Sequence, residues 1–139
     1  MSDFEVARKF LEACDGGKGW GECKQYVADN ASFVAQSEPL VDIATVEAYC
    51  GWADNFGNVI APGASFDLHA SSYDEATRTA LFFATFNAKH TGEGGPVPPT
   101  GQETHTHYVY CITMDSSGKV EKMVKIWNAP WAMKELGWA

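Results

Sequence analysis

The chain has 139 residues, of which 45% are hydrophobic and 20% charged, and its formal net charge at neutral pH is −8. This length fits one domain over residues 1–139, and the composition is that of a soluble globular protein. The acidic balance and the lack of a lysine- or arginine-rich run argue against nucleic acid or an anionic membrane surface as a partner.

The ends and the cysteines favour a cytoplasmic protein. The charged, amphipathic start has no apolar core of signal-peptide length, and no window reaches the length of a membrane span. The cysteines at positions 14, 23, 50 and 111 form no C-x-x-C pair or cluster. In a reducing compartment we expect buried or partly buried thiols, because a catalytic thiol would need an electropositive neighbourhood.

The first half of the chain has apolar residues at helical spacing. A first helix is expected to end at Gly16-Gly17, and Asp42 is expected to cap a later one. The predicted elements of this half are a helix over 3–14, a short helix over 20–28, a strand over 31–35 and a helix over 43–56.

From Phe66 onward the apolar period changes from that of a helix to two, which is typical of strands. Asp74-Glu75 is expected to form one turn, and the DSSG sequence that starts at Asp115 a second. The predicted elements are strands over 66–73, 77–90, 102–114 and 119–127, and a closing helix over 129–138 with Pro130 near its start.

Helices followed by long antiparallel strands indicate an α+β fold. Both faces of the long strands carry apolar residues, with Phe82 and Phe86 on one side and Leu81 and Phe83 on the other. We therefore expect helices on one face of the sheet, and partial cover or a partner on the other. A curved sheet wrapped over helices forms a cone, whose hollow suits a small ligand.

The stretch HTGEGGPVPPTG, residues 90–101, interrupts two of these strands. Its glycines permit positive φ angles and close backbone approach, and its prolines stiffen the bend. One interpretation is a shaped connector that returns the chain antiparallel. The other is that the segment also forms a lip of the pocket mouth and places His90 there.

This segment resembles one found in the SnoaL-like polyketide cyclases and ester cyclases, a group with the nuclear-transport-factor-2-like cone fold. In that group H-x-G-x-F-x-G-x-P-P-T-G often joins two long strands, although Gly94 stands here for the phenylalanine and Pro96 for the middle glycine. The end of the chain also matches the group, with a G-K-(I/V) hairpin, then a tryptophan and a Leu-Gly pair nine residues further on. The resemblance covers nearly the whole chain. The matching positions are His90, Gly92, Pro98, Pro99, Thr100, Gly101, Gly118, Lys119, Val120, Trp127, Leu136 and Gly137.

The resemblance implies a pocket for a hydrophobic small molecule and a homodimer formed through the outer face of the sheet. Enzymes with this fold generally move a proton next to a carbonyl, using a base and a hydrogen-bond donor. Ketosteroid isomerases use a tyrosine of the first helix, a general-base aspartate and a protonated aspartate that stabilises the oxyanion. These fall at Phe10, Ala35 and Tyr110 here, so isomerisation by that machinery is not expected. The acid that the cyclases carry on the long strand also falls at Tyr110.

Tyr110 is therefore the leading pocket residue, as a proton donor or oxyanion stabiliser, and a tyrosine buried in the core is the alternative. The candidate base is His90 or His107. Other candidate ligand contacts come from aromatic and polar residues near the expected cone. These are Tyr26, Phe33, Trp52, His69, Tyr108 and Asn128.

Glu103, His105 and His107 alternate along one strand and share a face, a pattern that could hold a divalent metal. Tyr110 has the opposite parity, so these three point outward if Tyr110 points inward. A bulge would reverse this. No cofactor is expected, because no phosphate-binding glycine-rich loop opens a helix and the sequence shows no clear metal site. Lys125 is interpreted as a solvated lysine.

Three functions fit these observations. The first is a SnoaL-like enzyme that cyclises, isomerises or hydrates a hydrophobic carbonyl compound. The second is a non-catalytic binding domain for an apolar ligand, consistent with the lack of an obvious carboxylate in the cone. The third is a scaffold whose exposed sheet recruits a protein. A cavity with convergent polar groups favours the first, an apolar cavity the second, and no cavity the third.

Overall fold

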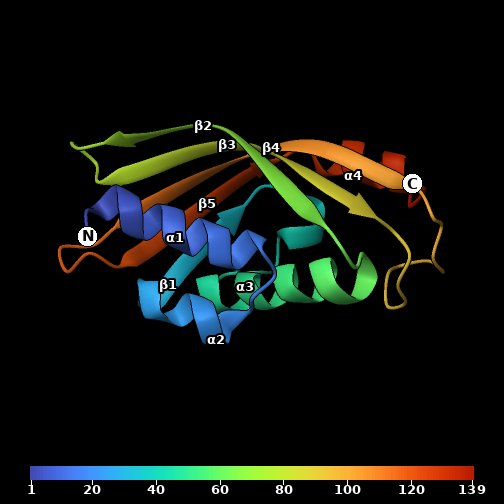
Figure 1. The fold of residues 1–139 in the computed structure, drawn as a ribbon, viewed down its shortest axis with the longest axis horizontal. Coiled ribbons are helices and arrows are strands. Elements are labelled where there is room, and N and C mark those ends of the chain that lie inside the picture. Colours follow the sequence, from blue (N-terminus) through green and yellow to red (C-terminus); the bar gives the residue numbers. More distant parts are fainter.

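The computed structural model describes all 139 residues, as helices packed against one curved sheet (Figure 1). Three helices precede most of the sheet and one follows it. In chain order the elements are α1 (Asp3–Asp15), α2 (Trp20–Cys23), β1 (Val27–Ala35), α3 (Val46–Asn55), β2 (Ser65–Asp74), β3 (Thr79–Lys89), β4 (Glu103–Met114), β5 (Val120–Trp127) and α4 (Ala129–Leu136).

The five strands lie in the order β1-β5-β4-β3-β2. β1 runs parallel to β5 and the other neighbours are antiparallel. In Figure 1 the sheet curves over α1 and α3, with α2 beside them, while α4 lies at the end of the sheet near the C-terminus. The α+β cone predicted from the sequence is therefore present. None of the helices combines the length and the apolar character that crossing a bilayer requires.

The main core lies between the inner face of the sheet and the helices, and strand alternation decides which residues enter it. Phe82 on β3 is fully buried in this core with Phe10 of α1, whereas its neighbours Leu81 and Phe83 are each 38% exposed on the outer face. Burial of apolar side chains supplies the main driving force for folding, so this alternation fixes the face of each strand.

Helix boundaries follow side-chain caps. Ser2 accepts a hydrogen bond from the backbone of Glu5 at the start of α1, and Thr45 accepts one from Ala48 at the start of α3. The expectation that Asp42 caps the later helix is wrong, because Thr45 satisfies the free amides of the first turn. The predicted helix over 20–28 is also too long: β1 takes over at Val27, which pairs with Val120 of β5.

A bulge in β2 changes the face of the residues after it. The pairing of β2 with β3 slips between Leu68 and Ala70, which leaves His69 without a register partner. Tyr73 therefore packs against the core like Leu68, although simple alternation puts them on opposite faces. Its hydroxyl donates to Asp3 of α1 over 2.7 Å, and the bulge thereby ties the sheet to the first helix.

The glycine- and proline-rich segment continues the β3–β4 hairpin without regular structure. Its ends are joined by hydrogen bonds from His90 to Gln102 and from Gly101 to His90. Gly92 donates to the carbonyl of Ile60 over 2.9 Å. A Cβ atom on Gly92 would lie 1.7 Å from the carbonyl oxygen of Val59, so only glycine allows this approach.

Candidate active site

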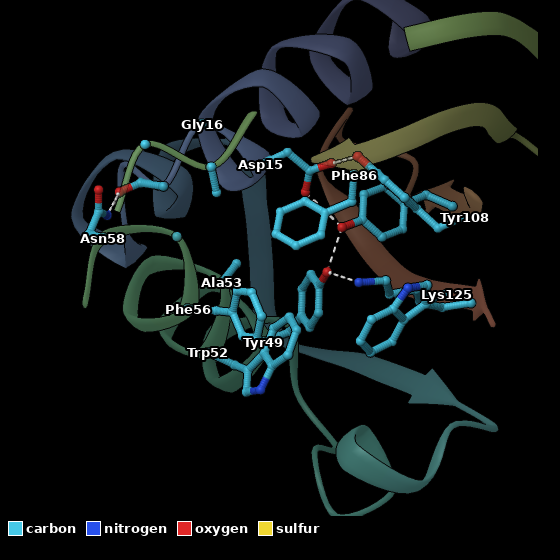
Figure 2. Close-up of a pocket in the computed structure, with 16 residues that line it drawn as sticks. Asp15, Gly16, Tyr49, Trp52, Ala53, Phe56, Asn58, Phe86, Tyr108 and Lys125 are labelled. Carbon is cyan, nitrogen blue, oxygen red and sulfur yellow. Dashed lines mark hydrogen bonds between the residues drawn. The ribbon is translucent and has the colours of Figure 1, made fainter. Parts of the chain in front are cut away.

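A cavity of about 100 Å³ lies between the end of α1, α3 and the inner face of the sheet. Its wall is mainly aromatic, with one acid and one lysine facing each other across it (Figure 2). The side chains that define it are Asp15, Tyr49, Trp52, Phe56, Phe86, Tyr108, Tyr110, Lys125 and Trp127.

Asp15 is the last residue of α1 and lies on the buried side of that helix, four residues after Leu11 and eight after Ala7. Its carboxylate accepts hydrogen bonds from two strand residues, Tyr108 at Oδ2 and Tyr110 at Oδ1. The second bond measures 2.7 Å. These bonds fix the orientation of the carboxylate at the cavity wall.

The hydrogen bonds continue from Asp15 to the other side of the cavity. The hydroxyl of Tyr49 on α3 lies 2.5 Å from that of Tyr110, and Nζ of Lys125 on β5 donates to it over 2.8 Å. Because Tyr110 donates to Asp15, Tyr49 donates to Tyr110. Lys125, Tyr49, Tyr110 and Asp15 thus form one hydrogen-bonded chain in which every donor points toward the carboxylate. Figure 2 shows Asp15, Tyr49 and Lys125 along this line of hydrogen bonds.

Lys125 is only 6% exposed, so the interpretation as a solvated lysine is wrong. It has the same strand parity as Met123 and Trp127, and that face of β5 turns toward the helices. Its Nζ lies between 4.5 and 5.7 Å from the centres of five aromatic rings. Ring faces at this distance attract a cation and partly replace lost water. These rings belong to Tyr49, Trp52, Tyr108, Tyr110 and Trp127.

Burial shifts the pKa values of Asp15 and Lys125, the two ends of the hydrogen-bonded chain, toward each other. Loss of solvent lowers the pKa of Lys125 to about 8, against the attraction of Asp15. Loss of solvent also raises the pKa of Asp15, although the bonds from Tyr108 and Tyr110 and the charge of Lys125 oppose the rise. Shifts caused by burial at two titratable groups of one cavity mark both groups as candidates for acid–base catalysis.

Three of the sequence candidates lie at this cavity. Tyr110 and Tyr108 are buried and present their hydroxyls to Asp15, while Trp52 is half-buried in the wall. Phe33 stacks on the far side of Tyr49, with ring centres 4.4 Å apart, and belongs to the core. Tyr26 also packs against the core, outside the cavity lining.

His90 does not lie at a pocket rim, as one interpretation of the glycine- and proline-rich segment predicted. It is completely buried under that segment and away from the cavity. Its Nδ1 accepts hydrogen bonds from Nε1 of Trp138 over 2.9 Å and from the backbone of Thr100 over 3.4 Å. This histidine holds the C-terminal end against the loop, which leaves it no access to a ligand in the cavity.

The remaining candidates face away from the cavity. His107 is exposed on the outer face of the sheet, and His69 lies on the same face, where its Nε2 is 2.7 Å from Oγ1 of Thr85. Asn128 is exposed and caps α4 by accepting a bond from the backbone of Trp131. None of the three contributes to the cavity wall.

The acidic and histidine residues at the start of β4 do not assemble into a metal centre. Glu103 and His105 are both exposed, with 3.4 Å between Oε2 and Nε2, and Nδ1 of His105 contacts Asn87 instead. No group of three histidine, cysteine or acidic side chains is arranged to hold an ion. The outward parity of these residues relative to Tyr110 holds, because the sheet carries no bulge between them.

Sequence reasoning missed Asp15, Tyr49 and the role of Lys125 in the wall. For Asp15 the signal was its spacing from Ala7 and Leu11, which continues the buried stripe of α1 by one more residue. For Lys125 the signal was its shared parity with Met123. An acid or a lysine on an otherwise apolar face is a candidate site residue, because burying a charge needs a compensating partner.

A second hollow, of about 260 Å³ and nearly all apolar, adjoins the first. Gly94, Gly95 and Pro96 form part of its wall, together with residues of α4. The glycine- and proline-rich segment therefore does border a hollow, through its middle residues instead of His90. Both hollows are lined by Trp52, Phe56 and Trp127, which thus separate the polar cavity from the apolar one.

The curved sheet and its covering helices form the same cone-shaped fold as solved structures named as SnoaL-like or proposed polyketide cyclases. IdmH, a proposed polyketide cyclase from Streptomyces antibioticus, superposes with a TM-score of 0.78 over 99% of both chains at 13% identity. AclR, a proposed hydroxylase from Streptomyces galilaeus, superposes at 0.76 with 18% identity over 97% of this chain and 95% of that one.

A proposed SnoaL-like polyketide cyclase from Jannaschia superposes with a TM-score of 0.73, at 16% identity, over 94% of this chain and 90% of that one. No protein-family model matches the sequence, and no curated protein matches it either. At these identities the likeness is one of fold, and the chemistry has to be argued from the cavity.

Proposed function

We propose that the chain is an enzyme that acts by acid–base chemistry on a small, hydrophobic carbonyl compound. The observation that carries this proposal is the carboxylate of Asp15, held by Tyr108 and Tyr110 inside an aromatic cavity with Lys125 opposite. An aromatic wall favours an apolar substrate body, and convergent polar groups orient a single polar function. Cyclisation, isomerisation and hydration all need such an arrangement.

In this proposal Asp15 replaces the histidines as the base. Its carboxylate removes a proton from the carbon next to the carbonyl, which is a step that needs a base of raised pKa in a dry site. Burial raises the pKa of Asp15, so its affinity for that proton is greater than that of an exposed aspartate. His90 and His107 have no access to the same cavity.

The negative charge that develops on the carbonyl oxygen needs donors already in place. Once Asp15 has taken the proton, the hydroxyls of Tyr108 and Tyr110 lose a charged acceptor and are free to donate to the oxyanion. Lys125 adds a positive charge behind them through Tyr49. Tyr110 thus keeps the role expected from the sequence, as a donor to an oxyanion.

The names of the structural neighbours, polyketide cyclases and a hydroxylase, support a small-molecule enzyme without fixing its reaction. The four cysteines are unpaired thiols, three of them buried, which supports a reducing compartment such as the cytoplasm as its location.

Exchange of the protons next to a carbonyl tests the proposal without knowledge of the natural substrate. A panel of hydrophobic ketones and aldehydes is incubated with the protein in D₂O, and loss of these protons is followed by NMR. We expect catalysed exchange of at least one compound by the wild type and by Asp42→Asn, an exposed aspartate outside the cavity. Absence of exchange across the whole panel would speak against the proposal.

The apolar hollow favours one alternative, in which the chain binds an apolar ligand without converting it. That function predicts a compound that binds with unchanged protons, and the same affinity for Asp15→Asn as for the wild type. Calorimetric titration of the panel compounds separates the two cases.

A further inference from the structure

Lys125 is the only buried lysine of the chain, since all other lysines are exposed. Its Nζ has a hydrogen-bond partner on one side, Tyr49, and aromatic rings around it. The acid–base function proposed above uses Lys125 only as a distant charge. Its position in the wall beside Tyr49 and Tyr110 allows a more direct part.

We propose that Lys125 attacks aldehydes and unhindered ketones and holds them as an imine, within the same cavity and on the same carbonyl substrates as the proposed function. A lysine acts in this way when it is desolvated in an apolar pocket, because the neutral amine is then within reach near physiological pH. The burial that lowers its pKa to about 8 supports this.

The hydrogen-bonded chain provides the route by which the amine loses its proton. The ammonium passes a proton to Tyr49, Tyr49 passes its own to Tyr110, and Tyr110 passes its own to Asp15. Because every donor already points toward Asp15, no hydroxyl has to rotate before the transfer. The result is a neutral amine and a neutral carboxylic acid, with both charges removed from a poorly solvated site.

The covalent step is balanced by the same groups. The lone pair of Nζ forms the bond to the carbonyl carbon as the C–O double bond becomes single, and one of the two protons on Nζ moves to the oxygen to give a neutral carbinolamine. Protonation of that hydroxyl by Asp15 lets it leave as water, and a protonated imine remains. Amine and carbonyl compound thus give imine and one water, without oxidant or reductant. The protonated imine is still a cation among the five rings, which stabilise it as they stabilised the ammonium.

Reductive trapping tests this directly. The wild-type protein is incubated with propanal or cyclopentanone and sodium cyanoborohydride, and the adduct is located by intact mass and peptide mapping. We expect one adduct per chain, on Lys125, with the mass of the probe less one oxygen. The matched control is Lys122→Met, which removes an exposed lysine three residues earlier on β5 and leaves the adduct in place. Lys125→Met abolishes it.

If the trapped adducts are confined to the exposed lysines and Lys125 is unmodified, the proposal that Lys125 forms an imine is wrong. Because the map is read in the wild-type chain, this result does not depend on whether Lys125→Met folds. Trapping and proton exchange also separate the two proposals. Exchange without trapping at Lys125 keeps Asp15 as the base that acts on the substrate carbon and rules out the imine. Trapping without exchange keeps the imine and rules out Asp15 as the base that removes a proton from the substrate carbon.

Discussion

Asp15 and Lys125 occupy the two ends of a hydrogen-bonded chain in a site that poorly solvates either charge. Each charge destabilises the fold through lost hydration and is partly compensated by its hydrogen bonds and by the other charge. An apolar pair of similar volume would often stabilise the fold at least as well, so stability alone does not account for these two groups.

The pKa of Lys125 predicts a pH dependence of stability. Below about pH 8 both the folded and the unfolded chain carry its proton, so the destabilisation is complete and constant. Between about 8 and the ordinary value of 10.5 only the unfolded chain holds the proton, so the free energy of unfolding increases with pH, by about 3 kcal/mol in total. Urea unfolding of the wild type and of Lys125→Met across this range measures the difference.

The increase should be present in the wild type and absent from Lys125→Met. Parallel curves for the two proteins would show that the pKa of Lys125 is ordinary in the folded state.

Tyr108 and Tyr110 offer a matched pair, because both donate to Asp15 but only Tyr110 also contacts Tyr49. Tyr110→Phe therefore interrupts the series of hydrogen bonds between Asp15 and Lys125, while Tyr108→Phe leaves that series intact. We expect each change to lower the free energy of unfolding by about 1–3 kcal/mol, since buried partners lose a hydrogen bond. The rate of trapping at Lys125 should fall at least about 10-fold in Tyr110→Phe only.

Equal trapping rates in the two variants would mean that protons reach Lys125 by another route. A thermal melt of each variant shows whether it is folded before its rate is compared.

At the scale of elements, the period of the apolar residues predicts which helices and strands form, and which of their faces is buried, better than it predicts where each one begins and ends. That Tyr110 and the histidines of β4 lie on opposite faces follows from alternation alone. Alternation fails for Tyr73, because the bulge at His69 shifts the register and no turn residue marks it. The start of α3 was misplaced because Asp42 and Thr45 are both good caps, and the backbone conformation that selects Thr45 depends on the preceding turn.

Gly92, in the segment that connects β3 and β4, tests whether close approach of the backbone requires glycine. Gly92→Ala places a methyl group on the carbonyl of Val59, so the loop has to move and lose its bond to Ile60. We expect a loss of more than about 2 kcal/mol in the free energy of unfolding. Gly51→Ala is the matched control, because Gly51 is exposed on α3 with open space around it.

The control should stabilise the chain by about 0.5–1 kcal/mol, as alanine does in a helix. Both values come from the same denaturant titration. If Gly92→Ala is as stable as the wild type, the contact with Val59 does not constrain the loop.

At the scale of the whole molecule, the site assembles residues that no local pattern connects. Asp15, Tyr49, Tyr110 and Lys125 come from two helices and two strands, and 95 residues separate Asp15 from Tyr110. Periodicity tells which of them point inward, but the order of the strands decides which inward residues meet. This is why the sequence indicates Tyr110 but does not indicate its carboxylate partner.

The outer face of the sheet is where we expect two copies to pair as a homodimer. Leu81 and Phe83 are each 38% exposed there, and Ile126 is 61% exposed. If two copies pair through this face, Ile126→Lys shifts the protein from dimer to monomer in analytical ultracentrifugation, whereas Val59→Lys, an exposed residue outside the sheet, does not. A wild-type monomer at all concentrations would exclude the dimer.

The central claim is that Asp15 is the base of a carbonyl-processing cavity. The measurement that tests it most directly is the rate of deuterium exchange next to the carbonyl of the best panel compound, with wild type and Asp15→Asn compared. The account predicts at least an approximately 100-fold lower rate for Asp15→Asn, which keeps the shape of the side chain but cannot take the proton. An unchanged rate in a folded Asp15→Asn protein would contradict it.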